Sequence, residues 1–464
     1  MEVVLPISKS LEPSSSTRFW SNLKKEHIFK IVLILVVLPI SVFLLSFFLQ
    51  WHTNVTSLID IDSNKLQPAQ VNSSVSNDND SKVMEQSLQN LQRWNFTYNH
   101  LNHNESNLEI KICITSTTSA GLNRLLQWIF YHKAIGVSNF FLFVEGEAAT
   151  LNSSKVLDSI PGVHAIPRTR ELEEQQAKSR LWNDTRMTIF MNKPCNHRLF
   201  LKQNLNMEMA IVMAREAGME WIFHFDTDEL LYPAGTTEYS VVELLTQLPE
   251  DVDTVVFLNY EAAVERDNIK EPFSEVSMFK KNLGHLPADS NFNVYYNEAT
   301  RNNPDFFLAY GNGKSGARIQ HDLSPSGAHR WEYDNRKPKE ATLKEAAILH
   351  YTYSRFSDLI SRRDRCDCKP TKEDTEKCFF LNFDRSAFII ASNSTETEMR
   401  HWYNEHVVWN DEVLKDKLLK TGILTRIYAP LVIIRRLMQS GVFASIMASS
   451  NATSLGMVET LPIR

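Results

Sequence analysis

The sequence has no excess of positive charge. Its 464 residues include 49 lysines and arginines against 55 aspartates and glutamates, for a formal net charge of -6. A nucleic-acid partner is therefore not expected, because binding a phosphate backbone requires concentrated positive charge. The densest basic run, Arg362 to Arg365, is explained equally well by a solvated helix end and by a binding site.

Internal repeats and nucleotide-binding loops are also missing. The glycine-rich basic segment Gly311–Arg318 lacks the spacing of a Walker phosphate loop, so ATP chemistry is not indicated. Lys314 or Arg318 in this segment could still pair with a diphosphate, and an ordinary flexible loop is the alternative.

Cysteine is scarce, with five residues, and an odd number leaves at least one thiol unpaired. Cys366, Cys368 and Cys378 have a spacing that resembles a zinc site, but only three ligands are local. A disulfide on an exposed loop is the favoured interpretation. Cys113 alternates with apolar residues in a strand-like run and is predicted to be a buried free thiol.

Charge is absent from the apolar segment Ile31–Leu49. A helix of this length spans a hydrocarbon core of roughly 30 Å, and Pro39 is better tolerated in a membrane helix than in a soluble one. A cleaved signal peptide is the alternative, but the segment is long for a signal core and no small-residue cleavage pattern follows it. We therefore predict a transmembrane signal anchor.

Lysines and arginines cluster before this anchor, and only Lys65 occurs in the thirty residues after it. This asymmetry predicts a type II orientation, with a cytoplasmic N-terminus and a luminal C-terminal part. The predicted luminal side carries all the glycosylation sequons of the chain. They are Asn54, Asn72, Asn79, Asn95, Asn104, Asn152, Asn183, Asn393 and Asn451.

The chain is divided by composition into a cytoplasmic tail (1–30), the anchor (31–49) and a polar segment without periodicity (50–108). We interpret the polar segment as a flexible luminal stem. Strands and helices alternate after it, which predicts an α/β fold with a mainly parallel sheet. The expected strands lie at 110–115, 140–144, 163–166, 221–225, 254–259 and 346–351.

The C-terminal part is predicted to be helical. Residues 260–345 show no clear pattern and are expected to be irregular. The expected C-terminal helices lie near 355–363, 396–409, 411–421 and 424–439.

Two carboxylates follow the predicted strand 221–225, in the order Asp226-Thr227-Asp228. Ligands of open α/β sheets bind at the carboxyl ends of the strands. Hard oxygen ligands two residues apart suit Mn²⁺ or Mg²⁺, and such a cation neutralises a departing nucleoside diphosphate. Asp226 and Asp228 are therefore predicted metal ligands for the transfer of a sugar from a nucleotide-sugar.

Other candidate site residues rest on weaker signals. Glu145 follows strand 140–144 and could accept a hydrogen bond from the ribose or base of the nucleotide. A general base requires a carboxylate near the donor. Asp322, Glu332 and Asp334 are the candidates, although an ordinary surface acid is the favoured interpretation of each one taken alone.

Longer motifs carry a resemblance to a known family. The segments LLQWIFYHKAIGVSNFFLFV and HFDTDELLYP resemble glycosyltransferases of families 2 and 92, which have the GT-A fold. The later segments GNGKSGARI, SPSGAHRW, AAILHYTYSRFSDLISRRDRCDCKP, FDRSAFIIAS and ILTRIYAPLVII resemble the plant KOBITO-type glycosyltransferase-like proteins. The resemblance covers about residues 110–445.

The resemblance implies a GT-A type sheet sandwiched by helices, with a nucleotide-sugar-binding half (109–260), an acceptor-binding half (261–355), a C-terminal helical part (356–445) and a flexible tail (446–464). His350 ends an apolar strand, and enzymes of this fold often complete the metal site with such a histidine. A structural histidine is the alternative. The resemblance also implies a plant Golgi membrane protein linked to cell-wall synthesis and cell elongation, with wall-synthesis proteins as partners.

Two further classes of function compete with a transferase. One is a non-catalytic relative that binds sugar or scaffolds a wall-synthesis complex, since a fold does not establish an activity. The other, a two-carboxylate glycoside hydrolase, is disfavoured because acids two residues apart cannot easily flank a sugar ring at ~5–9.5 Å.

Overall fold

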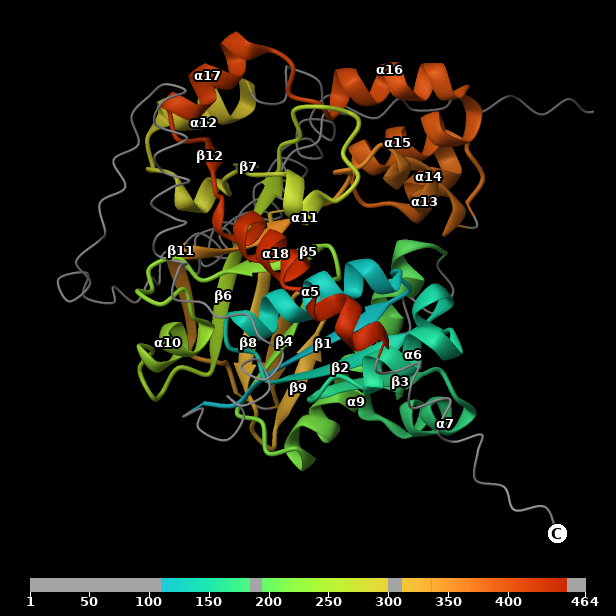
Figure 1. The fold of residues 1–464 in the computed structure, drawn as a ribbon, viewed down its shortest axis with the longest axis vertical. Helices are drawn as coiled ribbons and strands as arrows, with labels where there is room; N and C mark the ends of the chain where they lie inside the picture. The colour runs from blue at the N-terminus through green and yellow to red at the C-terminus, as the bar shows by residue number, and fades with distance from the viewer. Residues whose placement is uncertain (1–109, 184–193, 299–310, 335, 367, 449–464) are drawn as a thin grey trace, which may run out of the picture. The chain divides into compact units, whose positions relative to one another are not determined.

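The computed structural model of the chain describes residues 110–183, 194–298, 311–334, 336–366 and 368–448 (Figure 1). The predicted cytoplasmic tail, membrane anchor and stem lie outside these residues, as does the chain after residue 448. The same holds for the sequons at Asn54, Asn72, Asn79, Asn95, Asn104 and Asn451.

Within the described ranges, no single helix is long and apolar enough to cross a membrane. The helices Ala429–Gln439 and Val442–Ala448, bent by 47°, pass that test only as a pair. Ile433, Ile434 and Leu437 of the first helix are buried inside the protein, as in the core helix of a globular domain.

A ten-stranded sheet forms the centre of the described part. Its strands follow the order β12-β7-β6-β8-β4-β1-β2-β3, and β11 pairs with both β5 and β6. The strands are β1 (Ile112–Thr118), β2 (Asn139–Val144), β3 (Val163–Pro167), β4 (Trp221–His224), β5 (Glu229–Tyr232), β6 (Thr254–Ala262), β7 (Met278–Lys280), β8 (Lys314–Arg318), β11 (Glu340–His350) and β12 (Leu424–Arg426). A separate hairpin pairs β9 (Leu323–Ser326) with β10 (Arg330–Tyr333).

The sheet is mixed, and most of its strands share one direction. Neighbours β3, β2, β1 and β4 are parallel, as are β6 and β11. In this sheet, only β5, β7 and β8 are antiparallel to the other strands. The predicted mixed, mainly parallel sheet is therefore confirmed.

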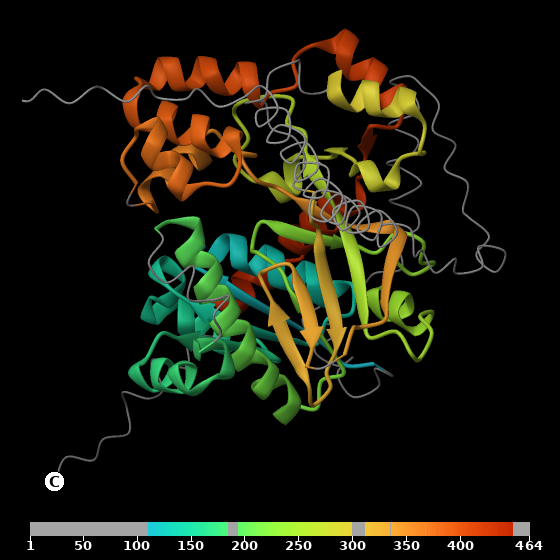
Figure 2. The same cartoon turned by 180° about the vertical axis from the view of Figure 1, so that it is seen from behind.

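Helices cover both faces of the sheet, because its central strands are apolar on both sides. All residues of β4 are buried, and β2 is buried except at Asn139. Figure 1 shows α5 and α18 in front of the central strands, and Figure 2 shows α9 across the opposite face. The helices of this part are α5 (Leu122–Ala134), α6 (Leu151–Asp158), α7 (Arg170–Lys178), α9 (Asn196–Glu216), α10 (Val241–Thr246), α11 (Pro272–Glu275) and α12 (Ser290–Glu298).

A group of helices follows the last long strand, β11. Because α13 begins seven residues after the carboxyl end of β11, the group starts at the carboxyl edge of the sheet. Its helices are α13 (Ser357–Asp364), α14 (Lys372–Cys378), α15 (Asn382–Asn393), α16 (Glu396–His406), α17 (Glu412–Lys420) and α18 (Ala429–Gln439). The predicted C-terminal helical part is thus present.

Two predictions of local structure were wrong. The described residues between 260 and 345 are not irregular as a whole, because they include β7, β8, β9, β10, α12 and the start of β11. Residues 424–439 are not one helix, because β12 pairs with β7 before α18 begins. Strand β8 also lies between β4 and β6, so the two predicted halves share one sheet.

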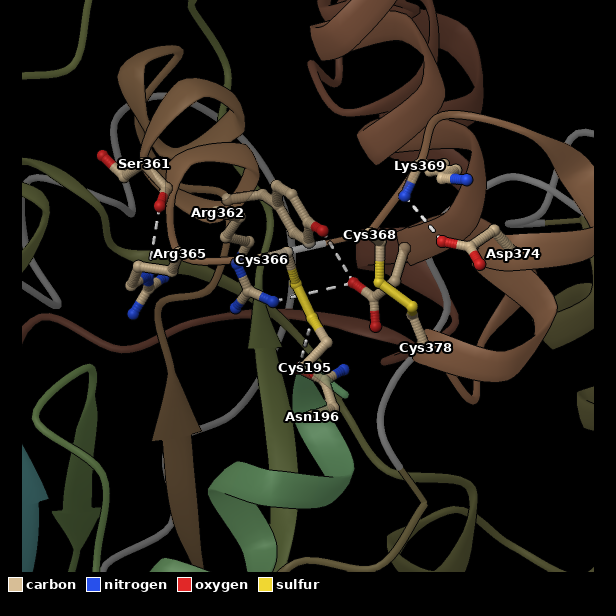
Figure 3. The surroundings of a disulfide bond; sticks show 12 residues. Cys195, Asn196, Ser361, Arg362, Arg365, Cys366, Cys368, Lys369, Asp374 and Cys378 are labelled. Carbon is tan, nitrogen blue, oxygen red and sulfur yellow. Dashed lines mark hydrogen bonds and ion pairs between the residues drawn. A yellow bond between two sulfur atoms is a disulfide. The ribbon is translucent and has the colours of Figure 1, made fainter. Parts of the chain in front are cut away.

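Two disulfides link the cysteines of the C-terminal helices. Cys368 pairs with Cys378, which confirms the predicted disulfide on this loop. Cys366 pairs with Cys195 at the start of α9, 171 residues away (Figure 3). Cys113 is free and buried, as predicted, and burial raises the pKa of its thiol.

Candidate active site

The candidate site lies where the parallel strands end. Strand β1 ends at Thr118, and Glu145 directly follows β2 and donates its backbone N–H to the Thr118 carbonyl oxygen at 2.8 Å. Strand β4 leads into the turn Asp226-Thr227-Asp228. The hydroxyls of Thr118 and Thr227 are 3.2 Å apart, which brings the turn beside the end of β1.

The turn is held by the strand that follows it. Glu229, the first residue of β5, accepts the backbone N–H of Asp226 on its carboxylate at 2.8 Å. Opposite Glu229 in the antiparallel ladder is His350, the last residue of β11. The Tyr351 N–H donates to the Asp228 carbonyl oxygen at 2.8 Å. Pairing of β5 with β11 therefore fixes the acids against His350.

Asp226 is neutralised by protein groups. Its Oδ2 lies 2.7 Å from the Lys314 ammonium, and its Oδ1 accepts from the Gln203 amide at 2.7 Å. Lys314 is fully buried and also lies 3.4 Å from Glu229 and 3.4 Å from the Ala328 carbonyl oxygen. Burial alone would raise the pKa of Asp226, but Lys314, His224 and His329 together lower that pKa well below the ordinary value.

Asp228 faces a buried histidine–glutamate pair. Its Oδ2 is 3.9 Å from the His350 Nε2. The other ring nitrogen, Nδ1, lies 2.9 Å and 3.1 Å from the two Glu261 carboxylate oxygens. Glu261 also accepts from the Asn259 amide. Burial lowers the pKa of His350, but the acids Glu261, Asp228 and Glu229 together raise it by more, to about 9.

This arrangement suits a divalent cation at Asp228 and His350. Two ligands that each bind at about 2.1 Å can lie no more than about 4.2 Å apart, and 3.9 Å meets that limit. A carboxylate that accepts from the second ring nitrogen of a histidine, as Glu261 does, is typical of metal-binding histidines. Asp226, Asp228 and His350 do not, however, gather all their ligand atoms within 4.8 Å in the described part of the chain.

The other predicted site residues are distributed over both edges of the sheet. Lys314 lies in the site, but its ammonium is engaged by Asp226 and Glu229. Glu145 lies at the carboxyl edge and forms an ion pair with Lys202 of α9 at 2.7 Å. Arg318 is paired with Trp221, the first residue of β4, and is thus at the opposite end of that strand from Asp226.

The predicted catalytic bases do not gather around Asp228. Asp322 forms an ion pair with Arg336 at 3.2 Å, and Arg336 also binds Asp253, which precedes β6 at the amino edge of the sheet. Glu332 lies within the β9–β10 hairpin opposite Ser324. Asp334 forms an ion pair with Arg180.

Three residues of the site were not predicted. Glu229 directly follows Asp228, so a search for a longer acidic cluster would have found it. Glu261 is an acid inside a strand of apolar residues, which signals a buried partner. Gln203 lies in the long helix α9 and has no distinguishing sequence signal.

Known glycosyltransferase-like proteins are similar to this chain over most of its length. The sequence pattern of Glycosyltransferase family 92 matches residues 109–377, which include the turn and His350. A glycosyltransferase-like protein of Arabidopsis thaliana is 57% identical over 430 residues, covering 90% of this chain and 94% of the relative. A second glycosyltransferase-like protein of that plant is 53% identical over 436 residues, covering 91% and 84%. The chain therefore belongs to glycosyltransferase family 92.

Proposed function

We propose that the chain transfers a sugar from a nucleotide-sugar donor to a glycan acceptor, with a divalent cation bound at Asp228 and His350. The observation that carries the proposal is that the His350 ring lies between the carboxylates of Asp228 and Glu261 at the carboxyl edge of the sheet. Mn²⁺ or Mg²⁺ at this place would neutralise the negative charge of the departing diphosphate.

Each protein group in the site has a separate task in this proposal. Glu261 orients His350 by accepting its Nδ1–H, so that Nε2 faces Asp228. Lys314 compensates the charges of Asp226 and Glu229, which keeps the turn folded around two nearby acids. Asp226 stays a predicted ligand that would have to bind with its remaining lone pairs.

The cellular setting belongs to the same proposal. A type II Golgi membrane protein would present this site to nucleotide-sugars and glycans in the lumen. The resemblance to KOBITO-type proteins supports a role in cell-wall synthesis and cell elongation, with wall-synthesis proteins as partners. The acceptor would then be a wall polysaccharide or a glycoprotein glycan.

A non-catalytic sugar-binding or scaffold protein is the second candidate. The observation that favours it is the saturation of Asp226 by Lys314 and Gln203, which leaves Asp228 as the less encumbered acid of the pair. Such a protein would bind its partner without needing the cation.

A binding experiment separates the two candidates. The full-length chain is melted with a panel of nucleotide-sugars, with and without Mn²⁺. We expect one donor to raise the melting temperature only with Mn²⁺, because a ligand at 100 times its Kd adds about 2.7 kcal/mol of stability. Asp228→Asn should abolish this shift, whereas Asp251→Asn, at an exposed acid paired with Lys339, should preserve it. A shift that survives in Asp228→Asn would contradict the proposed metal site.

A further inference from the structure

Two arginines, Arg124 and Arg365, interact electrostatically with Asp228. Arg124 comes from the first turn of α5, and Arg365 ends α13. Burial lowers the pKa of both guanidiniums, and Arg362 and Arg124 lower that of Arg365 further. The Asp228 carboxylate acts in the opposite direction and raises the pKa of both Arg124 and Arg365. The two arginines therefore share one electrostatic neighbourhood with the proposed metal ligand.

Packing shows how Arg124 reaches the site. Its guanidinium lies over the Phe273 ring, 5.9 Å from the ring centre. Phe273 packs edge to face on Tyr351 at 4.8 Å, and the Tyr351 N–H donates to the Asp228 carbonyl oxygen. Arg124 of α5 thus contacts Phe273, Phe273 packs on Tyr351, and the Tyr351 backbone hydrogen-bonds to the acidic turn.

The other acids near Arg124 are occupied by different donors. Glu271 accepts from the amides of Asn123 and Gln127 on its two oxygens, at 3.0 Å and 2.9 Å. Asp358 accepts from Arg355 on both oxygens, through the backbone N–H and the guanidinium. In the described part of the chain, neither carboxylate forms an ion pair with the α5 guanidinium.

Arg124 and Arg365 consequently lack a carboxylate partner within 4.0 Å among the residues that the structure describes. The Nη2 of Arg124 is buried without a hydrogen-bond partner. Arg365 donates to the Ser361 carbonyl oxygen at 3.1 Å (Figure 3). Arg362 differs, because Thr352, Asp384 and the Tyr353 ring hold its guanidinium.

Leaving a buried guanidinium donor unpaired is unfavourable, and holding a second arginine near it adds repulsion. An anionic ligand would relieve both costs. Guanidinium groups bind phosphate oxygens with two parallel N–H bonds, which makes arginine suited to this ligand class.

We propose that Arg124 and Arg365 bind the diphosphate group of the donor beside the Asp226-Thr227-Asp228 turn. This inference rests on the proposed function, because it assigns the phosphates of the same nucleotide-sugar. The two guanidiniums would share with the cation the neutralisation of the leaving group. The run Arg362 to Arg365 then serves two purposes, since Arg362 anchors α13 and Arg365 contacts the ligand.

Binding of inorganic pyrophosphate to the full-length chain, measured by calorimetry with and without Mn²⁺, tests the proposal. Arg124→Gln and Arg365→Gln should each weaken binding about tenfold, because each removes a charge-assisted hydrogen-bond donor. Arg363→Gln is the matched control on α13, since Arg363 binds Asp364 and the Ala391 carbonyl oxygen instead. It should bind pyrophosphate like the parent.

Although neighbouring atoms surround its guanidinium, Arg365 as a whole remains exposed to solvent, so Arg365→Gln should fold even if Arg124→Gln does not. The proposal would be overturned if Arg365→Gln bound pyrophosphate as tightly as the parent does. It would also be overturned if glucuronate competed for the site as well as pyrophosphate does. If Asp228→Asn loses pyrophosphate binding while both arginine variants keep it, this inference fails and the proposed function stands. If the parent binds neither pyrophosphate nor any nucleoside diphosphate, both fail.

Discussion

Lys314 is the residue on which the acidic turn most depends. It is a buried cation that compensates Asp226 and Glu229. Lys314→Met would leave two carboxylates without their partner, and breaking a buried ion pair on one side costs about 3–5 kcal/mol. We therefore expect a loss of this size in the free energy of unfolding, measured by urea denaturation.

The pH dependence of this loss provides the check. Burial raises the pKa of Glu229 to about 7 even with Lys314 present, so Glu229 can take up a proton when Lys314 is absent. Lys314→Met should therefore be less harmful at pH 5 than at pH 8. Lys339→Met, at an exposed ion pair with Asp251, should cost no more than about 1 kcal/mol. Equal losses in the two variants would show that Lys314 has no such role.

His132 should make the protein sensitive to acid. Its Nδ1 donates to the Trp128 carbonyl oxygen at 2.8 Å, and its Nε2 accepts from the Leu231 N–H at 3.3 Å, so the folded protein holds it neutral. Burial lowers its pKa to about 3. The unfolded chain takes up this proton below pH 6.5, and folding stability should fall from pH 6.5 towards pH 3, by up to ~1.4 kcal/mol per pH unit.

Unfolding measured at several pH values separates this effect from that of other histidines. His132→Gln should have a shallower pH dependence between pH 6.5 and pH 4 than the parent, although it is less stable overall. His401→Gln, at an exposed histidine, should keep the parental dependence. An unchanged slope in His132→Gln would mean that His132 does not titrate between the two states.

At the residue scale, the sequence predicted Asp226, Asp228 and His350. It predicted neither the acids Glu229 and Glu261 nor the ion pair of Asp226 with a lysine. Asp226 and Asp228 were recognisable because they follow a short apolar strand. Lys314 pairs with Asp226 across 88 positions of sequence, and this contact depends on β8 lying between β4 and β6. Local patterns carry no information on such a pairing, so Lys314 was predicted to bind a diphosphate.

At the scale of elements, the disulfide between Cys195 and Cys366 joins the start of α9 to the end of α13, across 171 positions of sequence. The disulfide between Cys368 and Cys378 closes a separation of only 10. A cross-link restricts the unfolded chain more when its loop is longer. The loss of chain entropy therefore corresponds to a stabilisation of about 5 kcal/mol for the first disulfide and about 3 kcal/mol for the second. The first pair should therefore stabilise the protein more.

Paired serine substitutions measure this difference. The variant with Cys195→Ser and Cys366→Ser should melt at a lower temperature than the one with Cys368→Ser and Cys378→Ser. Reduction of the parent should lower its melting temperature below that of either variant under oxidising conditions. The reverse order of the two variants would contradict the loop-length argument.

Elements of the parallel half were predictable because their signals are local. The run FFLFV became β2, and the periodic residues after Leu122 became α5. Strand β8, with the sequence KSGAR, has no apolar run, yet it lies buried in the sheet. Gly316 makes room for it, since a Cβ there would lie 2.1 Å from the Phe223 ring. Burial of so polar a strand depends on neighbours distant in sequence, so residues 260–345 were predicted to be irregular.

At the scale of the whole molecule, the proposed site combines residues of the sheet and of the C-terminal helices. Strand β11 supplies His350 and continues into α13, which supplies Arg365, while Cys366 ties the same helix end to α9. The sequence identified these segments separately. It could not show that they converge at the carboxyl edge, because their convergence results from the order of strands in the sheet.

The predicted type II orientation has a test in the described part of the chain. Asn152 and Asn393 both lie in N-x-S/T sequons and are exposed, on α6 and at the end of α15. A luminal domain would meet the glycosylation machinery, and a cytosolic one would not. Both residues should therefore carry a glycan when the full chain is expressed in plant cells.

Gel mobility before and after treatment with a peptide N-glycosidase checks this prediction. Asn152→Gln and Asn393→Gln should each move faster than the parent by the mass of one glycan. Asn382→Gln is the control, because Asn382 is exposed on α15 but lies outside any sequon. If neither sequon variant changes mobility and the enzyme has no effect on the parent, the domain is not luminal. In that case the proposal that the site meets nucleotide-sugars and glycan acceptors in the Golgi lumen also fails. The membership of family 92 and the geometry around Asp228 do not depend on the orientation.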